Sequence, residues 1–319
     1  MRLLRGYREG SADPAEYVAA IGGFDGIHLG HRALIKRMHE LAREQRRASM
    51  VVTFEPLPKE YFAPDYPPGR LTNFRERWRL LEQDGPDALW LFHFNERLRA
   101  IRAADFARLL INGGVRQIVI GHDFRAGFQG EATAQWFRSV GQGMGLATEV
   151  MAPIEDNGLR IGSGAIRTAL AAPDFGIAAR MLGRPYTMRG RVIPGDRLGR
   201  TFGFPTANIR LARRQTPIDG IFAVRVRGVG DGVASIGTRP TVGGATPLLE
   251  VHVFDFTGDL YGRELEVEFV ARLRDTVHFK DTKAMIGQMH RDAADARTVL
   301  AGKKLRGVRR WAIQITRRR

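Results

Sequence analysis

The hydrophobic pattern of this 319-residue chain changes its period between the two halves, and this change limits the folds that it can adopt. In the first half, short apolar runs alternate with segments of helical period. Short apolar strands separated by helices indicate a parallel sheet that is covered on both faces. The predicted strands are residues 18–22, 50–54, 89–92 and 117–120, with a further element at 146–151. The predicted helices are residues 32–46 and 106–111. The first of these helices has one apolar stripe, formed by Leu34, Ile35, Met38, Leu41 and Ala42.

The second half has strands of period two. Leu249, Val251 and Val253 share one face of a predicted strand, while Glu250 and His252 share the other. This pattern is typical of an antiparallel barrel in which one face of each strand is exposed to solvent or to a ligand. The predicted strands are residues 187–192, 221–227, 233–236, 248–254 and 264–270, followed by a helix at 282–300.

Length and composition fit a globular protein of two domains. We place the boundary near Pro173, so that the domains are residues 1–172 and 173–319. The absence of cysteine excludes disulfides, thiolate metal sites and a cysteine nucleophile, and it fits a reducing cytoplasm. Residues 1–10 are too polar for a signal peptide, and no apolar run approaches the ~20 residues of a membrane helix. We therefore expect a cytoplasmic location and no membrane partner.

The chain is strongly basic. It has 50 Lys and Arg against 34 Asp and Glu, a formal net charge of +16. Such a charge favours anionic partners, whether nucleotides, nucleic acid or anionic lipid. A nucleic-acid-binding protein is therefore one alternative, although the sequence has no recognisable DNA- or RNA-reading motif and an arginine-rich composition explains the charge equally well.

A glycine-rich run at residues 190–208 is the candidate ligand site of the second half. Glycines let backbone N–H groups approach a ligand closely, and such donors beside arginine attract phosphate oxygens. Oxygen ligands such as those of Thr206 and Asn208 suit Mg²⁺. The run lacks the lysine of a Walker loop, because Asp196 follows the second glycine. We predict a cradle for ATP and Mg²⁺, with a loop between strands as the alternative. Its candidate residues are Gly190, Gly195, Asp196, Gly199, Arg200, Gly203, Pro205, Thr206 and Asn208.

The segment at residues 22–31 is the candidate site of the first half, where it joins the first strand to the first helix. His28 and His31 lie about one helical turn apart on the same side. The N–H groups of a helix start attract phosphate, and imidazoles there can donate to phosphoryl oxygens as charge develops. Gly30 leaves room for a nucleotide. A metal pair and a structural pair of histidines are the alternatives.

Both segments resemble those of one family. Residues 190–208 resemble the signature of riboflavin kinase in the C-terminal half of bacterial bifunctional riboflavin kinase/FMN adenylyltransferases, and residues 22–31 are similar to the G-x-F-D-G-x-H-x-G-H nucleotidyltransferase signature. The resemblance implies a Rossmann-like α/β nucleotidyltransferase domain followed by an antiparallel β-barrel riboflavin kinase domain. It further implies phosphorylation of riboflavin to FMN and adenylylation of FMN to FAD, with ATP and Mg²⁺ in both steps.

The resemblance also assigns roles to single residues. It places Glu250 as the catalytic base of the kinase, which agrees with the position of Glu250 on the non-core face of its strand; Glu264, Glu266 and Glu268 alternate equally well and receive no role. Residues 53–56 and 121–125 match further family segments. The residues that the resemblance places at the adenylyltransferase site are His28 and His31 at the ATP phosphates, with Gly23, Phe24, Asp25, Gly30, Asp123, Phe124, Ser163 and Arg167 around them.

The chain departs from the family pattern at four positions. Gly162 and Gly164 replace two hydroxyl residues, Ala126 replaces a large aromatic residue and Leu57 replaces a histidine. A lost hydroxyl hydrogen bond to phosphate costs about 1.5–3 kcal/mol. Two alternatives follow: a protein that is a riboflavin kinase only, or a nucleotidyltransferase domain that uses another acceptor, such as a phosphorylated alcohol or nicotinamide mononucleotide. The oligomeric state stays open.

Overall fold

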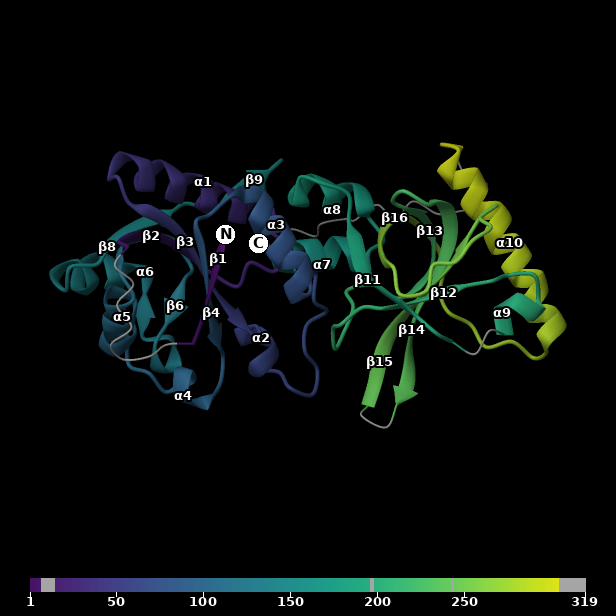
Figure 1. Cartoon of the computed structure of the whole chain (residues 1–319), viewed down its shortest axis with the longest axis horizontal. Helices are drawn as coiled ribbons and strands as arrows, with labels where there is room; N and C mark the ends of the chain where they lie inside the picture. The colour runs from purple at the N-terminus through teal and green to yellow at the C-terminus, as the bar shows by residue number, and fades with distance from the viewer. Residues whose placement is uncertain (7–14, 196–197, 242–243, 304–319) are drawn as a thin grey trace, which may run out of the picture. The chain divides into compact units, whose positions relative to one another are not determined.

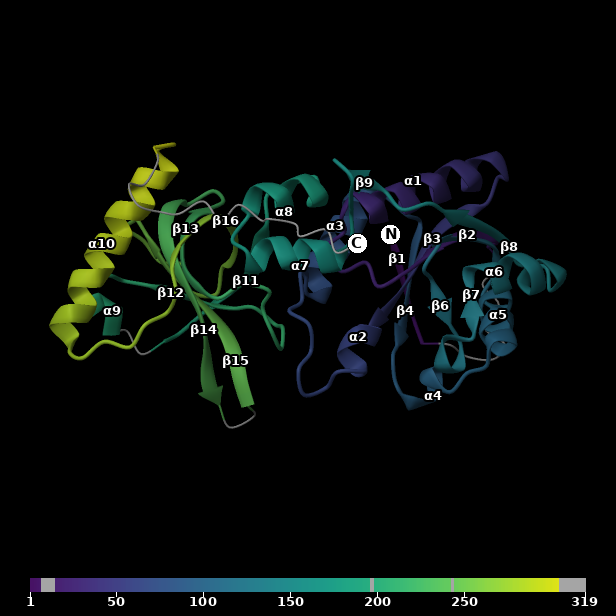
Figure 2. The same cartoon turned by 180° about the vertical axis from the view of Figure 1, so that it is seen from behind.

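The computed structural model describes residues 1–6, 15–195, 198–241 and 244–303, and they form two compact units (Figures 1 and 2). The first unit consists of Met1–Ala165 with Met181–Gly183, and the second of Ile166–Arg180 with the chain from Arg184 onward. The helices α7 (Ser163–Ala171) and α8 (Phe175–Leu182) each contribute residues to both units. The boundary after residue 172 stays a prediction.

The first unit is built on a six-stranded sheet whose paired strands all run parallel. The strand order is β1-β4-β3-β2-β5-β8, so the direction of winding reverses between β2 and β5. This order is that of a Rossmann-like fold with one strand added at the edge. The strands are β1 (Arg2–Arg5), β2 (Tyr17–Ile21), β3 (Ala48–Glu55), β4 (Ala88–His93), β5 (Val115–Gly121) and β8 (Ala147–Met151).

Helices cover both faces of this sheet, which confirms the predicted layering. Alternate residues of β2 enter two separate apolar clusters: Val18 packs in the cluster that contains Met38 of α1, and Ala19 in the cluster that contains Phe106 of α5. The stripe predicted on the first helix is buried at Ile35, Met38, Leu41 and Ala42. The α-helices described within this unit are α1 (Leu29–Glu44), α2 (Pro58–Tyr61), α3 (Phe74–Asp84), α4 (Glu96–Arg99), α5 (Ala103–Asn112) and α6 (Ala134–Trp136). Two short antiparallel pairs complete it: β6 (Arg125–Ala126) pairs with β7 (Ala132–Thr133), and β9 (Glu155–Asp156) pairs with β10 (Leu159–Arg160).

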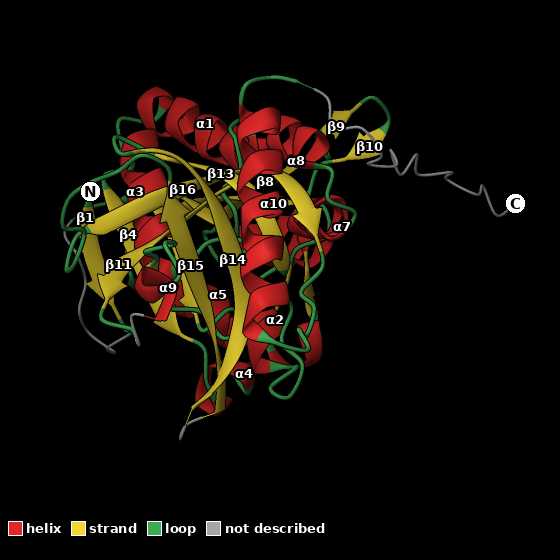
Figure 3. Cartoon of the chain, turned by 90° about the vertical axis from the view of Figure 1, so that its right-hand side faces the viewer, coloured by secondary structure: helices red, strands yellow, loops and turns green. Residues whose placement is uncertain are grey.

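The second unit contains the predicted antiparallel barrel, which closes in the order β11-β12-β15-β14-β13-β16. Leu249, Val251 and Val253 are buried, and Glu250 and His252 are partly exposed, as the alternation predicts. The helix α10 (Thr282–Leu300) has the predicted bounds and packs on β13, β14 and β16 (Figure 3). The strands are β11 (Thr187–Ile193), β12 (Ala207–Arg210), β13 (Gly220–Val226), β14 (Gly230–Thr241), β15 (Gly244–Val253) and β16 (Glu264–Arg274), and the short helix α9 (Leu198–Thr201) precedes β12.

Candidate active sites

The first candidate site lies where the winding of the parallel sheet reverses. Residues 22–31 form the loop after β2 and the first residues of α1, and the loop after β5 carries Asp123 and Phe124. Since β2 and β5 are parallel neighbours, both loops leave the same edge of the sheet. Ligands of such sheets bind at this edge, beside the point of reversal. The structure therefore brings together the two loops that the sequence analysis singled out.

His28 and His31 form a stacked pair at the start of α1. His28 is the N-cap residue, and its Nδ1 accepts a hydrogen bond from the backbone N–H of His31 at 3.2 Å. The two ring centroids lie 3.6 Å apart at an interplanar angle of 20°. Because Nδ1 of His28 is the acceptor, its Nε2 carries the proton of the neutral ring. The pair thus presents an N–H donor beside the helix N-terminus.

His31 lies in an environment that disfavours its charged form. Burial, His28 and Arg77, in that order, lower the pKa of His31 well below its usual value. Its Nδ1 is buried and has no hydrogen-bond partner among the described residues. His31 is therefore neutral at neutral pH, with one ring nitrogen available to a bound group.

Several predicted contact residues of this segment stabilise the turn itself. Asp25 is 4% exposed, and its carboxylate accepts hydrogen bonds from the backbone N–H of Leu71 and from both the N–H and the hydroxyl of Thr72. Phe24 is fully buried and contacts the His31 ring. A Cβ on Gly30 would lie 3.1 Å from Nδ1 of His28, so this glycine makes room for the imidazole.

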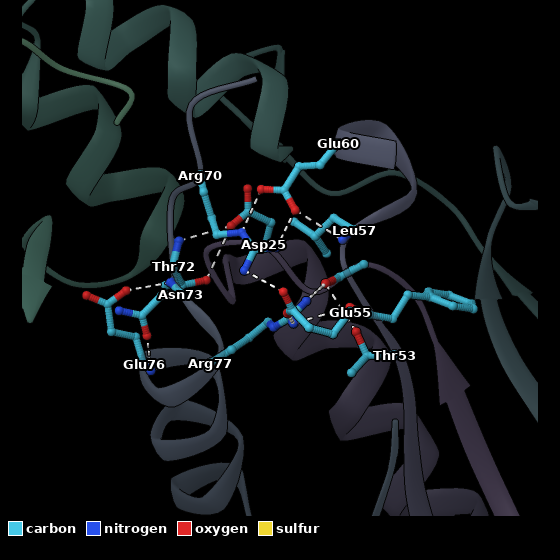
Figure 4. Close-up of polar contacts among 12 residues, drawn as sticks. Asp25, Thr53, Glu55, Leu57, Glu60, Arg70, Thr72, Asn73, Glu76 and Arg77 are labelled. Atoms are coloured by element: carbon cyan, nitrogen blue, oxygen red, sulfur yellow. Dashed lines mark hydrogen bonds and ion pairs between the residues drawn. The ribbon is translucent and has the colours of Figure 1, made fainter. Parts of the chain in front are cut away.

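A buried cluster of charges under this turn escaped the sequence analysis (Figure 4). Arg70 pairs with the carboxylates of Glu60 and Glu55, and Arg77 pairs with the other oxygen of Glu55. Arg77 is 1% exposed, and burial lowers its pKa, although an arginine remains charged in proteins. Two cations and two anions balance each other in this cluster, which offsets part of the penalty for burying them.

Among the remaining predicted residues of the first site, Asp123, Phe124 and Ser163 belong to the first unit, and Arg167 belongs to the second. Asp123 forms an ion pair with Arg160 of β10, and Phe124 packs on the core ring of Phe137. The hydroxyl of Ser163 donates to the backbone carbonyl of Asp25 at 2.8 Å, which ties the start of α7 to the turn. Arg167 lies one turn later on α7. A Cβ on Gly162 or on Gly164 would meet nothing within 4 Å.

The second candidate site lies on the barrel, where β12 meets β15. Asn208 of β12 stands directly opposite Glu250 of β15 in the strand register. Asn208 is 8% exposed, and its Oδ1 is buried without a hydrogen-bond partner among the described residues. A Cβ on Gly195 would lie 2.2 Å from Nδ2 of Asn208, so only glycine allows the amide this position. The amide therefore has one oxygen ready for a ligand.

The turn before β12 is held on several sides. The Nδ1 of His252 hydrogen-bonds to the carbonyl of Pro205 at 2.9 Å, and the Phe204 ring packs on the rings of His252 and His290. The N–H of Phe204 donates to the carbonyl of Gly199 at 2.8 Å. Gly203 adopts a positive φ of 79°, which favours glycine. This turn places Thr206 two residues before Asn208.

Other residues of the glycine-rich run lie in different elements. Gly190 lies within β11, and a Cβ there would lie 2.1 Å from the carbonyl oxygen of Arg210, so the close approach of two strands accounts for it. Arg200 lies on α9. Asp196 lies outside the described residues.

The β16 glutamates lie beside other strands than Glu250 does. Glu266 forms ion pairs with Arg189 and Arg227, and Glu268 lies 3.7 Å from Arg225. These glutamates face neighbouring strands that do not carry the Asn208 amide. The strand register, which places Glu250 opposite Asn208, therefore distinguishes Glu250 from the β16 glutamates, whereas the alternation of polar and apolar residues does not.

The donor set of the barrel site fits a hard divalent cation. In the part of the chain that the structure describes, no group of three or more His, Cys, Asp or Glu side chains gathers to hold a metal ion. Mg²⁺ prefers oxygen ligands and keeps several of its positions for water and substrate phosphates. The hydroxyl of Thr206 and the Oδ1 of Asn208, which is without a partner in the described part of the chain, are oxygens of this kind.

Comparisons with known proteins match both units. A family model described as FAD synthetase matches residues 10–165, and one described as riboflavin kinase matches residues 182–300. A bifunctional riboflavin kinase/FMN adenylyltransferase of Pseudomonas fluorescens is 41% identical over 94% of this chain and 98% of its own length. The protein of that description from Escherichia coli K12 is 40% identical over 93% of this chain and 97% of its own length.

A solved structure has the same fold over almost the whole chain. It is titled a macrolide-efflux protein from Streptococcus pneumoniae, is 29% identical, and aligns with a TM-score of 0.76 over 93% of this chain and 99% of that one. Among the helices described here, none is both long enough and apolar enough to cross a membrane.

Proposed function

The chain belongs to the family of bifunctional riboflavin kinase/FMN adenylyltransferases, and on that premise we propose how its residues divide the two reactions. The barrel unit transfers the γ-phosphate of ATP to the 5′-hydroxyl of riboflavin and forms FMN. The parallel-sheet unit transfers AMP from a second ATP to FMN and forms FAD and pyrophosphate. The observation that supports the first assignment best is the buried Oδ1 of Asn208, which lies opposite Glu250 and has no hydrogen-bond partner among the described residues.

In the kinase reaction, Glu250 accepts the proton of the riboflavin hydroxyl. Thr206 and Asn208 supply the oxygens that would hold Mg²⁺, which when bound neutralises charge on the transferring phosphate. The backbone N–H groups at Gly195, Gly199 and Gly203 are the proposed contacts of the ATP phosphates. Phosphoryl transfer depends mostly on such positioning and charge neutralisation, so this unit needs little covalent chemistry of its own.

In the adenylyl transfer, His28 and His31 face the ATP phosphates. The N–H on Nε2 of His28 and the N-terminus of α1 stabilise the negative charge that develops on the α-phosphate and on the leaving pyrophosphate. A neutral His31 costs less to bury than a charged one would. Asp123, Phe124, Ser163 and Arg167 are proposed contacts of FMN and of the nucleotide. We propose that Gly23, Phe24 and Asp25 act through the backbone of the turn.

One time course tests this division. Purified protein is incubated with riboflavin, ATP and Mg²⁺, and the flavins are separated by chromatography. We expect FMN to form first and FAD to follow. FMN without FAD would favour a kinase whose first unit uses another acceptor, and a panel of acceptors with pyrophosphate detection would then identify it. Tight, salt-sensitive RNA binding without flavin turnover would instead support a nucleic-acid-binding protein.

Replacing Glu250 with glutamine tests the assignment of the base. The change keeps the shape of the side chain and removes the proton acceptor, so kcat for FMN formation should fall about 100-fold. The matched control is Glu268→Gln on β16, which makes the same chemical change beside Arg225. We expect the control to keep full kinase activity. A loss of similar size in both variants would reject Glu250 as the base.

Restoring hydroxyls at the start of α7 should strengthen the adenylyl transfer. A Cβ at Gly162 or Gly164 meets no atom within 4 Å, so the first side-chain atom of Gly162→Ser and of Gly164→Thr fits without rearrangement. One new hydroxyl bond to phosphate is worth about 1.5 kcal/mol, so kcat/KM for FAD formation should rise about tenfold. Gly143→Ser, at another open position of this unit, is the control. An unchanged rate of FAD formation in both Gly162→Ser and Gly164→Thr would show that no phosphate lies beside these residues.

A further inference from the structure

The carbonyl oxygen of Gly23 is held by two side chains from different elements. The Nη1 of Arg77, on α3, donates to it at 2.8 Å, and the hydroxyl of Thr53, on β3, donates to it at 3.2 Å (Figure 4). Both side chains are buried, with 1% of Arg77 and none of Thr53 exposed. A single backbone oxygen with two buried donors has little freedom to turn.

The same guanidinium also joins the turn to the end of β3. Its Nη2 donates to the carbonyl of Phe54 at 3.2 Å and pairs with the Glu55 carboxylate. Arg70 donates to the other oxygen of Glu55 at 2.9 Å, so the carboxylate keeps a cationic partner even without Arg77. The cluster therefore places a fixed donor under the turn without leaving a buried charge unbalanced.

The backbone beyond Gly23 is strained, which makes this restraint necessary. Phe24 and Ile27 have φ values of 51° and 41°, in the left-handed region that bulky and branched residues avoid. Residues in such conformations persist only where the surroundings enforce them, and they concentrate at functional sites. The peptide that links Gly23 to Phe24 is planar and trans, so its N–H points opposite to its carbonyl. Fixing the Gly23 carbonyl on Arg77 therefore aims the Phe24 N–H away from the cluster.

We infer that Arg77 and Thr53 are positioning residues for adenylyl transfer: together they hold the Gly23 carbonyl and thereby fix the strained turn that carries His28 and His31. Neither side chain is proposed to touch the substrate. The inference rests on the proposed function of the first unit, because the rate of FAD formation is its main readout. It predicts that removing a donor lowers the rate of the bound complex more than it weakens binding of ATP.

The mildest test is Thr53→Val, which keeps the shape of the side chain and removes one donor. Arg77 still satisfies the Gly23 carbonyl in this variant, so the unit should fold. We expect kcat for FAD formation to fall about tenfold, because small misplacements of reacting groups have effects of this size. The matched control is Thr148→Val on β8, where the hydroxyl donates to the carbonyl of Phe137 at 3.3 Å. The control should keep its kcat.

Two substitutions at Arg77 give a graded series. Arg77→Met removes both the donors and the charge, and kcat for FAD formation should fall about 100-fold. Arg77→Lys keeps the charge and one donor, and it should recover part of that loss. Kinase activity and the melting temperature of each variant report on folding, and calorimetry with a non-hydrolysable ATP analogue reports on binding.

The pH profile separates positioning from a general loss of structure. Among the described residues, the ionisable groups whose charges act on His31 are His28, at the N-cap of α1, and Arg77, on α3. Removing the Arg77 charge raises the pKa of His31 toward its usual value, so the acid limb of the FAD-formation profile should move to higher pH in Arg77→Met and stay in place in Arg77→Lys.

The outcomes divide as follows. Lower kcat in Thr53→Val and Arg77→Met, with ATP binding retained and Thr148→Val unaffected, supports the inference. Three results would overturn it: an equal loss of kcat in Thr53→Val and Thr148→Val, full FAD formation by Arg77→Met, or losses of kcat that only follow the unfolded fraction of each variant. Wild-type protein that binds the ATP analogue but forms no FAD would reject the proposed function first. A Thr53→Val chain whose His28 and His31 ring signals by NMR match those of the wild type would then overturn the inference separately.

Discussion

Replacing Asn208 with alanine is expected to lower the rate of FMN formation by about a thousandfold, while the conversion of FMN to FAD continues at its normal rate. The Oδ1 of Asn208 is a buried acceptor that has no partner among the described residues, which is an unfavourable state unless a ligand completes it. Alanine removes this oxygen and leaves Thr206 as the only proposed side-chain ligand of Mg²⁺. Each half-reaction is measured separately, from riboflavin and from FMN, with saturating ATP and Mg²⁺.

A second variant separates the ligand role of Asn208 from its packing against Gly195. Asn208→Asp keeps an oxygen in place and adds a negative charge, so it should retain measurable kinase activity with an altered dependence on Mg²⁺ concentration. Because the amide of Asn208 fills the space beside Gly195, the melting temperature of both variants is needed as a control. Full kinase activity in Asn208→Ala, or equal loss of both reactions, would contradict separate sites with Asn208 in one of them.

The parallel sheet could be predicted from the sequence because its strands are apolar on both faces. All five residues of β2 are buried, since helices cover the sheet on both sides. The barrel could be predicted for the opposite reason, as its alternating strands bury one face only. In both units the hydrophobic period reports how many faces of a strand lie in the core.

Two short strands could not be predicted in this way. β1 has the sequence Arg-Leu-Leu-Arg, which shows neither a long apolar run nor an alternation, and pairing with β4 alone makes it a strand. β12 contains the polar residue Asn208, and the sequence analysis predicted no strand here, because it assigned residues 190–208 to the candidate cradle for ATP and Mg²⁺. Its backbone instead completes the barrel between β11 and β15, and this ladder places Asn208 opposite Glu250.

The buried charge cluster depends on contacts between residues that are distant in the sequence. Arg77 lies 54 positions from Gly23 and 22 from Glu55. One signal was present: Arg77 falls on the same helical face as Phe74 and Leu81, where an apolar residue is expected. A charged residue on a core-facing stripe indicates a buried partner, but the sequence does not say which one.

Motif residues also proved to serve different physical needs. Gly190 and Gly195 belong to the same glycine-rich run, yet one allows two strands to approach and the other makes room for the Asn208 amide. Asp25 lies within the nucleotidyltransferase signature, and its carboxylate anchors the segment at residues 71–72. A motif therefore marks a site, and only coordinates divide its residues between ligand contacts and support.

Replacing His28 with alanine is expected to have the reverse effect of Asn208→Ala. FAD formation should fall by about a hundredfold to a thousandfold, as for the loss of one donor to a developing oxyanion, and FMN formation should be unchanged. The N–H on Nε2 of His28 is the proposed donor, and alanine removes it. The measurement is the rate of FAD and pyrophosphate release from FMN and ATP.

The complication is that His28 also caps α1. Its Nδ1 accepts the hydrogen bond from the N–H of His31, and losing an N-cap acceptor destabilises a protein by about 0.5–2 kcal/mol. His28→Ser separates the two roles, because serine is a favoured N-cap residue and restores the acceptor without restoring the imidazole. We expect His28→Ser to recover the melting temperature and to remain as inactive in FAD formation as His28→Ala.

His39 provides the matched control for these variants. It lies on the same helix, and its Nε2 hydrogen-bonds to the carbonyl of Asp84 at 3.0 Å, away from the turn. His39→Ala therefore removes a helix histidine and a hydrogen bond without changing the start of α1, and its rate of FAD formation should stay normal. If His28→Ser regains FAD formation together with stability, the imidazole of His28 serves only as a cap, and the charge that develops on the phosphates must be stabilised by the backbone of the turn and by His31.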